Sequence, residues 1–512
     1  MPGSGSRSGV FIMLNEYQIV GPPGCGKTTT LTKQIEHSVN EYGYNRVLVT
    51  SLTKTAAHEL TDRTSAIDTR NIGTLHSICY RSLDRPQLAE KRISEWNEKN
   101  PQHAKEGVPT SEDDVATTDY QSDEVWGVIE LLRQRMIPEE NWPGQVLKVY
   151  NKYCNWKDSE GLMDFTDFIE NAIDIVPDVD VIIADEAQDY SRLELKLLRS
   201  WADKTEKLII AGDPDQVLYH WRGADPNLFR EGHSGRKVLK QSYRVPEAVH
   251  VKAVEWIHQI SDREEFEYLP TGEKGFVKSS PNTLKYFNVN EMMKLPGKKM
   301  ILATCGYMLR NIISVLKARG IPFWNPYRFK AGNWNPIRRQ TTERLKNFLK
   351  EQKTMGELWS AVEHMRREFL QYGVKAKLKA KENKTVPINQ FDEFDYYSDQ
   401  GLELETPLDW FDALNKTKQK AWRYLRRVVE KQGVDGLFKE PEIIVGTVHS
   451  VKGGEADYVY LFPDLSKKAE KSIYTKEGKE SMIRTFYVGM TRAKKGLFLC
   501  RGQNTSSAAI WN

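Results

Sequence analysis

Short apolar runs alternate with amphipathic stretches in the first half of the chain. The apolar runs are YQIV (17–20), RVLVT (46–50), VIIAD (181–185) and LIIAGD (208–213). Segments of helical periodicity follow them, beginning near Lys27 and again within LELKLLRSW (193–201). A strand, a crossover helix and another strand predict a parallel sheet with right-handed connections. These segments therefore predict one α/β lobe.

The same order returns in the second half. KMILAT (299–304) precedes a helical stretch to Arg319, and EIIVGTVHS, DYVYLF (457–462) and GLFLC (496–500) follow later. This pattern predicts a second α/β lobe with a parallel sheet, and charged segments of helical pattern interrupt both lobes. We expect a first lobe of residues 13–80 and 165–224 and a second lobe of residues 225–324 and 441–512. Residues 81–164 and 325–440 would form the inserted subdomains, and residues 1–12 a leader.

Composition narrows the class of protein only slightly. No apolar run is long enough to span a membrane and no signal peptide is evident, so we expect a cytoplasmic protein. The five cysteines lie without CxxC spacing, which disfavours disulfides and zinc. The 74 Lys and Arg against 70 Asp and Glu leave a net charge of +4, which neither requires nor excludes a polyanionic partner.

The stretch GPPGCGKTTT carries the first chemistry. A G-x4-G-K-T loop between a strand and a helix lets backbone N–H groups surround phosphate oxygens. Lys27 would reach the β- and γ-phosphates, and the Thr28 hydroxyl would bind Mg²⁺. The expected nucleotide-binding residues are Gly21, Pro22, Pro23, Gly24, Cys25, Gly26, Lys27, Thr28 and Thr29.

An acidic pair follows a later apolar run. In VIIADEAQD, Asp185 would hold Mg²⁺ and Glu186 would orient and deprotonate the attacking water. Together with the glycine loop, this pair predicts hydrolysis of a nucleoside triphosphate.

The stretch GDPDQVLYHWRGADP combines amide, aromatic and cationic groups. Gln216 would sense the γ-phosphate, and Tyr219, Trp221 and Arg222 could meet unpaired bases through stacking and cation–π contacts. The alternative is that Tyr219 and Trp221 are ordinary core aromatics.

These motifs, with SYRVPEAV, TVHSVKGGEADYVYL and FYVGMTRAKKGLFL, resemble in order and spacing the UvrD/Rep/PcrA-like helicases of superfamily 1A. The resemblance covers most of both α/β lobes. It implies two RecA-like lobes with ATP and Mg²⁺ in the cleft between them, an inserted subdomain in each lobe, and a 3′→5′ motor on single-stranded DNA.

The resemblance also implies roles for single residues. Tyr243 resembles the ring that stacks on adenine, Glu455 the carboxylate that contacts the ribose, and Arg244 and Arg492 the two γ-phosphate arginines. The same comparison gives Lys27, Thr28, Asp185, Glu186 and Gln216 the roles stated above. The DNA-binding residues that it nominates are Thr53, His76, Tyr219, Trp221, Arg222, Thr447 and His449.

Three features of the sequence depart from the family pattern. Leu52 stands where the family has a phenylalanine that stacks on a base, and Gly454 and Ala456 replace two packing side chains. Gln18 belongs to the first strand, so we do not expect it to read adenine as the family's upstream glutamine does.

Two basic runs leave their role open. The run KAKLKAKENK (375–384) could follow duplex phosphates or form a solvated face, and we expect KKAEK (467–471) to be solvated.

We therefore expect an ATP- and Mg²⁺-dependent 3′→5′ DNA helicase that acts on single strands and on junctions with duplex. Residues 325–440 are short for the second insertion, so strand separation could require a protein loader or a second protomer. The alternatives are a translocase that removes proteins without unwinding, and a nucleotide-switched binding module.

Overall fold

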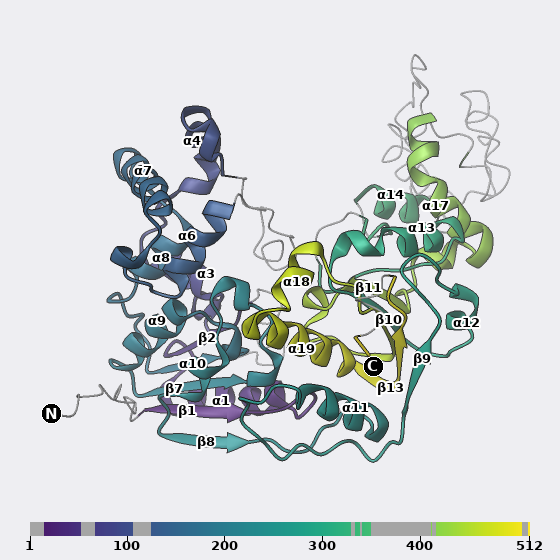
Figure 1. Cartoon of the computed structure of the whole chain (residues 1–512), viewed down its shortest axis with the longest axis horizontal. Coiled ribbons are helices and arrows are strands. Elements are labelled where there is room, and N and C mark those ends of the chain that lie inside the picture. Colours follow the sequence, from purple (N-terminus) through teal and green to yellow (C-terminus); the bar gives the residue numbers. More distant parts are fainter. Residues whose placement is uncertain are drawn as a thin grey trace, which may run out of the picture. The chain divides into compact units, whose positions relative to one another are not determined.

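The computed structural model describes residues 15–52, 67–105, 124–328, 333–337, 340–349, 411, 416–503 and 510–511 (Figure 1). The chain divides into two compact units. The first contains Met1–Ser279, Val448–Glu455 and Leu465–Leu499, and the second contains Ser280–Thr447, Ala456–Asp464 and Cys500–Asn512. The boundaries predicted for the lobes and insertions stay a prediction.

The first unit is built on a parallel six-stranded sheet with the strand order β3-β2-β6-β7-β1-β8. Its central strands are buried along almost their whole length, as expected for a parallel sheet covered on both faces. The strands are β1 (Glu16–Val20), β2 (Val47–Thr50), β3 (Ile72–Gly73), β6 (Val181–Ala184), β7 (Lys207–Gly212) and β8 (Gly235–Val238).

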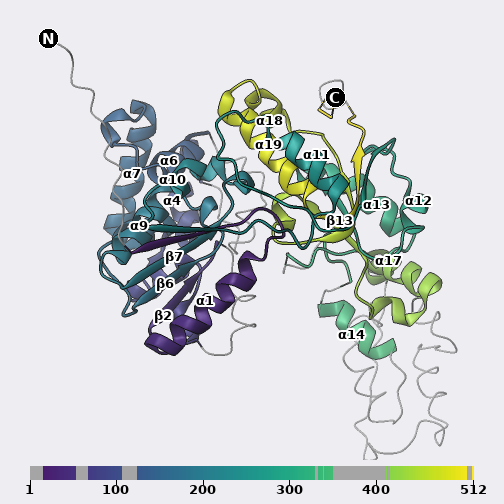
Figure 2. The same cartoon turned by 90° about the horizontal axis from the view of Figure 1, so that it is seen from below.

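Side chains that alternate along these strands supply two separate cores. On one face, Ile19, Val49 and Ile183 pack with Leu31 and Ile35 of α1 (Lys27–Tyr42). The opposite face packs against α3 (Leu75–Ser82), α8 (Phe165–Asn171) and α9 (Arg192–Ala202). Figure 2 shows α1 and α9 on opposite sides of the sheet. This is the α/β class with a parallel sheet that the sequence predicts.

The segment between α3 and α8 is largely helical in its described residues, as predicted. Its helices are α4 (Ile93–Lys99), α6 (Glu124–Gln134) and α7 (Gly144–Glu160), and their shared core contains Trp96, Trp126, Tyr153 and Trp156. A two-residue strand pair, β4 (Gln87–Leu88) with β5 (Leu162–Met163), was not predicted.

A second sheet has the strand order β11-β10-β12-β13-β9. In the second unit, β10 (Lys299–Ala303) lies between β11 (Ile443–Thr447) and β12 (Ala456–Leu461), and is parallel to both. The other strands are β9 (Phe276–Ser280) and β13 (Ala493–Cys500). The strands predicted in the second half of the sequence are therefore confirmed, and β9 is an addition.

Among the described residues, eight further α-helices belong to the two units. In the first unit they are α10 (Pro226–Arg230), α11 (Glu247–Ile257), α18 (Lys467–Ser472) and α19 (Lys476–Met490). In the second unit they are α12 (Val289–Met293), α13 (Arg310–Ala318), α14 (Gln340–Leu349) and α17 (Lys416–Gln432). Among the residues described, no helix is both long and apolar enough to cross a membrane.

Candidate nucleotide and nucleic-acid site

The glycine loop lies between the end of β1 and the start of α1. Gly24 and Gly26 have left-handed φ angles of 78° and 77°. A Cβ atom on Gly24 would lie 2.6 Å from the Cβ of Arg244, and one on Gly21 would lie 2.8 Å from the Cγ of Lys27. A side chain at either position would fill the cradle, so its shape depends on glycine and suits the close approach of phosphate.

Two predicted loop residues have defined surroundings. Lys27 Nζ donates to the carbonyl oxygen of Gly21 at 2.7 Å, so the cation is held beside the cradle. Burial raises the pKa of the Cys25 thiol to about 12, so Cys25 is a neutral packing residue and not a nucleophile. Thr28 and Thr29 lie in the first turn of α1, and Pro22 and Pro23 lie within the loop.

Asp185 and Glu186 follow β6 directly. Glu186 has a left-handed backbone with a φ angle of 54°, and its N–H donates to the Asp185 carboxylate at 2.9 Å. Burial, reinforced by the Glu186 charge, raises the pKa of Asp185 to about 7. Burial also opposes ionisation of Glu186, but the nearby Lys452 and Lys27 cations hold its pKa well below the ordinary value. Glu186 is thus kept as a carboxylate.

Lys452 is a residue of the site that we did not predict. Its Nζ lies 3.1 Å from Glu186 Oε2, and it also pairs with the Asp189 carboxylate. Burial lowers the pKa of this lysine, and the Glu186 carboxylate opposes that shift. In the sequence, Lys452 is a single cation in VKGGEA, three residues before Glu455. Its position in that motif does not indicate that it would contact Glu186.

Gln216 and Arg492 are joined directly. The Gln216 side-chain oxygen accepts from Arg492 at 2.7 Å, and its amide nitrogen donates to Asp213 at 2.6 Å. Arg492 is only 2 % exposed and also donates to the carbonyl oxygens of Val488 and Gly454. The predicted γ-phosphate amide and one predicted arginine are therefore neighbours.

Arg244, Glu455 and Tyr243 lie at another edge of the loop. Glu455 accepts from Arg244 and from Lys494, both at 2.9 Å. The Tyr243 N–H donates to the Gly24 carbonyl oxygen at 2.9 Å, while its side chain is 76 % exposed. This leaves an exposed ring beside the phosphate cradle, as stacking on a base would require.

The predicted DNA-binding aromatics differ in exposure. Tyr219 is 3 % exposed and Trp221 is 43 % exposed, with ring centroids 6.1 Å apart. The His449 ring lies 5.9 Å from that of Tyr219. Trp221 can therefore meet a base in the structure as it stands, whereas Tyr219 lies in the core beneath it.

His76 and Arg222 both approach the buried carboxylate of Glu194. Arg222 donates to Glu194 at 2.9 Å, and His76 Nδ1 lies 4.0 Å from the same oxygen. These two predicted DNA residues are thus brought together by a buried acid.

Comparison with known proteins bears on this arrangement. Residues 6–234 match the UvrD/REP helicase N-terminal domain, and residues 196–504 match the UvrD-like helicase C-terminal domain. The chain belongs to the UvrD-like helicase family. The fold of that family implies two RecA-like lobes, in agreement with the parallel sheets described above.

Several relatives of this chain are named helicases. ATP-dependent DNA helicase PcrA of Bacillus subtilis is 28% identical over 275 residues, which cover 47% of this chain and 37% of the relative. DNA helicase II of Haemophilus influenzae is 24% identical over 318 residues, which cover 52% and 42%. A probable DNA helicase II homolog of Mycoplasma pneumoniae is 22% identical over 605 residues, which cover 95% and 82%. Two of these three matches span less than half of the relative's length.

The donors present fit a magnesium ion with a triphosphate. Thr28 offers a hydroxyl beside the cradle, and Asp185 offers a carboxylate whose charge is buried. Mg²⁺ is commonly held by one or two protein ligands together with phosphate oxygens and water. Among the described residues, no cluster of three or more His, Cys, Asp or Glu side chains forms an all-protein metal site.

The other positions singled out in the sequence have different outcomes. Thr447 ends β11 in the second unit and is buried, while Thr53 and the basic run 375–384 lie outside the described residues. Gln18 is buried in β1 and donates to the Phe229 carbonyl oxygen at 2.6 Å, so its side chain serves the core. This agrees with the expectation that Gln18 does not read adenine.

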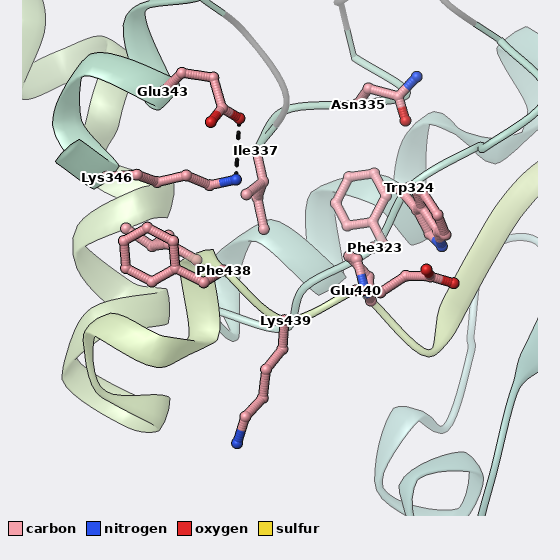
Figure 3. Close-up of a pocket in the computed structure, with 11 residues that line it drawn as sticks. Phe323, Trp324, Asn335, Ile337, Glu343, Lys346, Phe438, Lys439 and Glu440 are labelled. Atoms are coloured by element: carbon pink, nitrogen blue, oxygen red, sulfur yellow. Dashed lines mark hydrogen bonds and ion pairs between the residues drawn. The ribbon is translucent and has the colours of Figure 1, made fainter. Parts of the chain in front are cut away.

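A separate cavity of about 460 Å³ lies in the second unit (Figure 3). Phe323, Trp324, Ile337 and Phe438 supply its apolar lining. Its polar edge includes the ion pair between Lys346 and Glu343 at 3.0 Å. None of the residues predicted for ATP or DNA lines this cavity.

Proposed function

We propose that this chain is an ATP-dependent DNA helicase that moves 3′→5′ on single-stranded DNA. The observation that carries the proposal is the convergence, around one glycine cradle, of a low-pKa carboxylate, Glu186, with the bonded pair Gln216 and Arg492. Its relatives named ATP-dependent DNA helicase and DNA helicase II support the choice of nucleotide and of polymer. The direction of movement comes from the family resemblance alone.

The hydrolytic roles follow from the chemistry of these residues. Lys27 and the loop N–H groups would bind the phosphates, and Thr28 and Asp185 would hold Mg²⁺, which supplies neutralising charge when bound. Glu186 would orient a water molecule and take its proton, because its low pKa keeps it unprotonated at neutral pH. Arg244 and Arg492 would stabilise the negative charge that develops on the transferred phosphoryl group.

A continuous set of contacts connects this chemistry to the exposed ring of Trp221. Asp189 pairs with Lys452 through one carboxylate oxygen and accepts from the Leu218 N–H at 2.9 Å through the other. The Leu218 carbonyl oxygen lies 3.3 Å from His449 Nε2. A change in the charge near Glu186 would thus reach the segment that carries Tyr219 and Trp221. We propose that this segment couples hydrolysis to DNA binding.

Strand displacement from tailed duplexes tests the proposal. With ATP and Mg²⁺, a duplex with a 3′ single-stranded tail should be opened, and duplexes with a 5′ tail or with blunt ends should not. Omitting Mg²⁺ or using the Glu186→Gln variant should abolish opening. Displacement from 5′ tails alone would contradict the polarity. DNA-stimulated hydrolysis without any displacement would instead support a translocase that does not separate strands.

A further inference from the structure

Gln188 joins the proposed base to the loop that follows β7. The residue is only 1 % exposed, and both ends of its side-chain amide are bonded. The amide nitrogen donates to Glu186 Oε2 at 2.6 Å, and the amide oxygen accepts from the Asp213 N–H at 3.1 Å. The Asp213 carboxylate accepts from the Gln216 side chain, so the same loop carries the amide proposed to sense the γ-phosphate.

The chemistry of its two partners allows the Gln188 amide one orientation. A backbone N–H can only donate, so it must face the amide oxygen, and an ionised carboxylate can only accept, so it must face the amide nitrogen. The fold leaves room for this arrangement, because a Cβ atom on Gly212 would lie 2.4 Å from Gln188 Oε1. Glycine at position 212 is therefore needed for the amide to reach the Asp213 N–H.

The two carboxylate oxygens of Glu186 have different surroundings. Oε2 accepts from Gln188 and also lies 3.1 Å from Lys452 Nζ. Oε1 has no hydrogen-bond or ion-pair partner among the described residues, and the side chain is 25 % exposed, so a water molecule can reach it. Each donor on Oε2 stabilises negative charge there and makes that oxygen a weaker proton acceptor. Oε1 is therefore the oxygen better suited to take a proton from water.

We propose that Gln188 is a positioning residue, which holds Glu186 so that Oε1 faces the attacking water. A general base must lie within hydrogen-bond reach of the proton that it takes, and a glutamate side chain without partners can rotate its carboxylate away. Gln188 and Lys452 oppose that rotation by fixing Oε2. Because the other end of Gln188 is bonded to the loop of Gln216, a movement of that loop would also shift the base. The inference rests on the proposed function, in which Glu186 is the base for ATP hydrolysis.

The alternative is that Gln188 only provides an acceptor for the buried Asp213 N–H. Two substitutions separate these roles. Gln188→Met keeps a similar shape and loses both bonds, whereas Gln188→Glu keeps an acceptor for Asp213 and places a negative charge against Glu186. A positioning role predicts that each variant lowers kcat for ATP hydrolysis at least about tenfold, while the Kd for ATP stays within about threefold of wild type.

Matched controls are Gln145→Met and Gln145→Glu, because Gln145 is an exposed glutamine on α7. Both controls should keep the wild-type kcat and Kd. The melting temperature of every variant is measured alongside. If Gln188→Met melts early, Gln188→Asn takes its place, because its amide is too short to reach both partners, and the same loss of kcat is expected.

A double-mutant cycle shows whether Gln188 acts through Glu186. In the Glu186→Gln background, adding Gln188→Met should change the remaining single-turnover rate by less than about twofold, because the group that Gln188 positions is already lost. An equal loss in both backgrounds, a normal kcat for Gln188→Glu, or weakened ATP binding with kcat retained would each overturn the inference. Near-normal hydrolysis by Glu186→Gln would refute the proposed function itself, whereas an inactive Glu186→Gln with fully active Gln188 variants would refute only the positioning role.

Discussion

At the scale of single residues, Lys452 controls the charge state of the proposed base. Removing this cation, 3.1 Å from Glu186, should raise the pKa of Glu186, because burial then acts with less opposition. The proposed hydrolysis needs Glu186 ionised, so the ratio of kcat/KM at pH 6 to that at pH 8 should fall in Lys452→Met. The ratio should stay near the wild-type value in Lys196→Met, which changes an exposed lysine on α9. Identical pH profiles for the two variants would refute this role.

Trp221 offers a second test at this scale, because its exposure distinguishes a binding ring from a core ring. Trp221→Ala should weaken binding to oligo(dT) by roughly 1 to 3 kcal/mol, with little change in melting temperature. Tyr474→Ala, which removes a ring that is 89 % exposed elsewhere in the first unit, should leave affinity unchanged. If Trp221→Ala instead lowers the melting temperature while affinity is retained, Trp221 is a packing residue.

Contiguous motifs could be predicted from the sequence, whereas contacts between distant residues could not. The glycine loop and the acidic pair could be predicted because each is a contiguous stretch beside an apolar strand. The contact of Lys452 with Glu186 could not, because 266 positions of chain separate the two residues and only the fold brings them together. For the same reason, nothing in LYHWRG indicated that Tyr219 would be buried and Trp221 exposed.

At the scale of elements, Glu90 makes the inserted helical segment sensitive to pH. Burial raises the pKa of Glu90 to about 7, with Lys105 Nζ 3.8 Å away as a partial counter-charge. In the unfolded chain, the carboxyl of Glu90 ionises near pH 4.5. The free energy of unfolding therefore falls by up to roughly 3 kcal/mol as pH rises from about 4.5 to about 7. In unfolding by urea, the loss between pH 5 and pH 8 should be smaller for Glu90→Gln than for wild type.

Glu98→Gln is the matched control for that experiment, because Glu98 is an exposed carboxylate on the neighbouring α4. Its stability should change with pH as the wild type does. The explanation fails if Glu90→Gln and Glu98→Gln lose the same free energy of unfolding between pH 5 and pH 8.

Helices and strands could be predicted from the sequence wherever their hydrophobic pattern extended over four or more residues. Four-to-six-residue apolar strands such as β6 and β7, and the amphipathic helix α9, were predicted and are confirmed. The strands β3, β4 and β5 have only two residues each, too short for any periodicity to appear. The strand β8 is GRKV, whose glycine and charges suit an edge strand more than an apolar core run.

At the scale of the whole molecule, the family match accounts for the fold, and the cluster around Glu186 accounts for the proposed hydrolysis. Two domain models of UvrD-like helicases together cover residues 6–504. Of the family departures at Leu52, Gly454 and Ala456, the one at Gly454 meets the cluster through its backbone, because the Gly454 carbonyl oxygen accepts from Arg492. A backbone carbonyl can accept there whatever side chain the residue carries, so we expect glycine at position 454 to leave hydrolysis intact.

We propose that DNA stimulates ATP hydrolysis at the cluster around Glu186. The most direct test is the steady-state rate of ATP hydrolysis, with and without saturating oligo(dT), for wild type and Glu186→Gln. We expect a wild-type rate that rises at least about tenfold with DNA, and a Glu186→Gln variant that binds ATP normally but hydrolyses it at least about a hundredfold more slowly. A wild-type rate indifferent to DNA, or near-normal hydrolysis by Glu186→Gln, would contradict it.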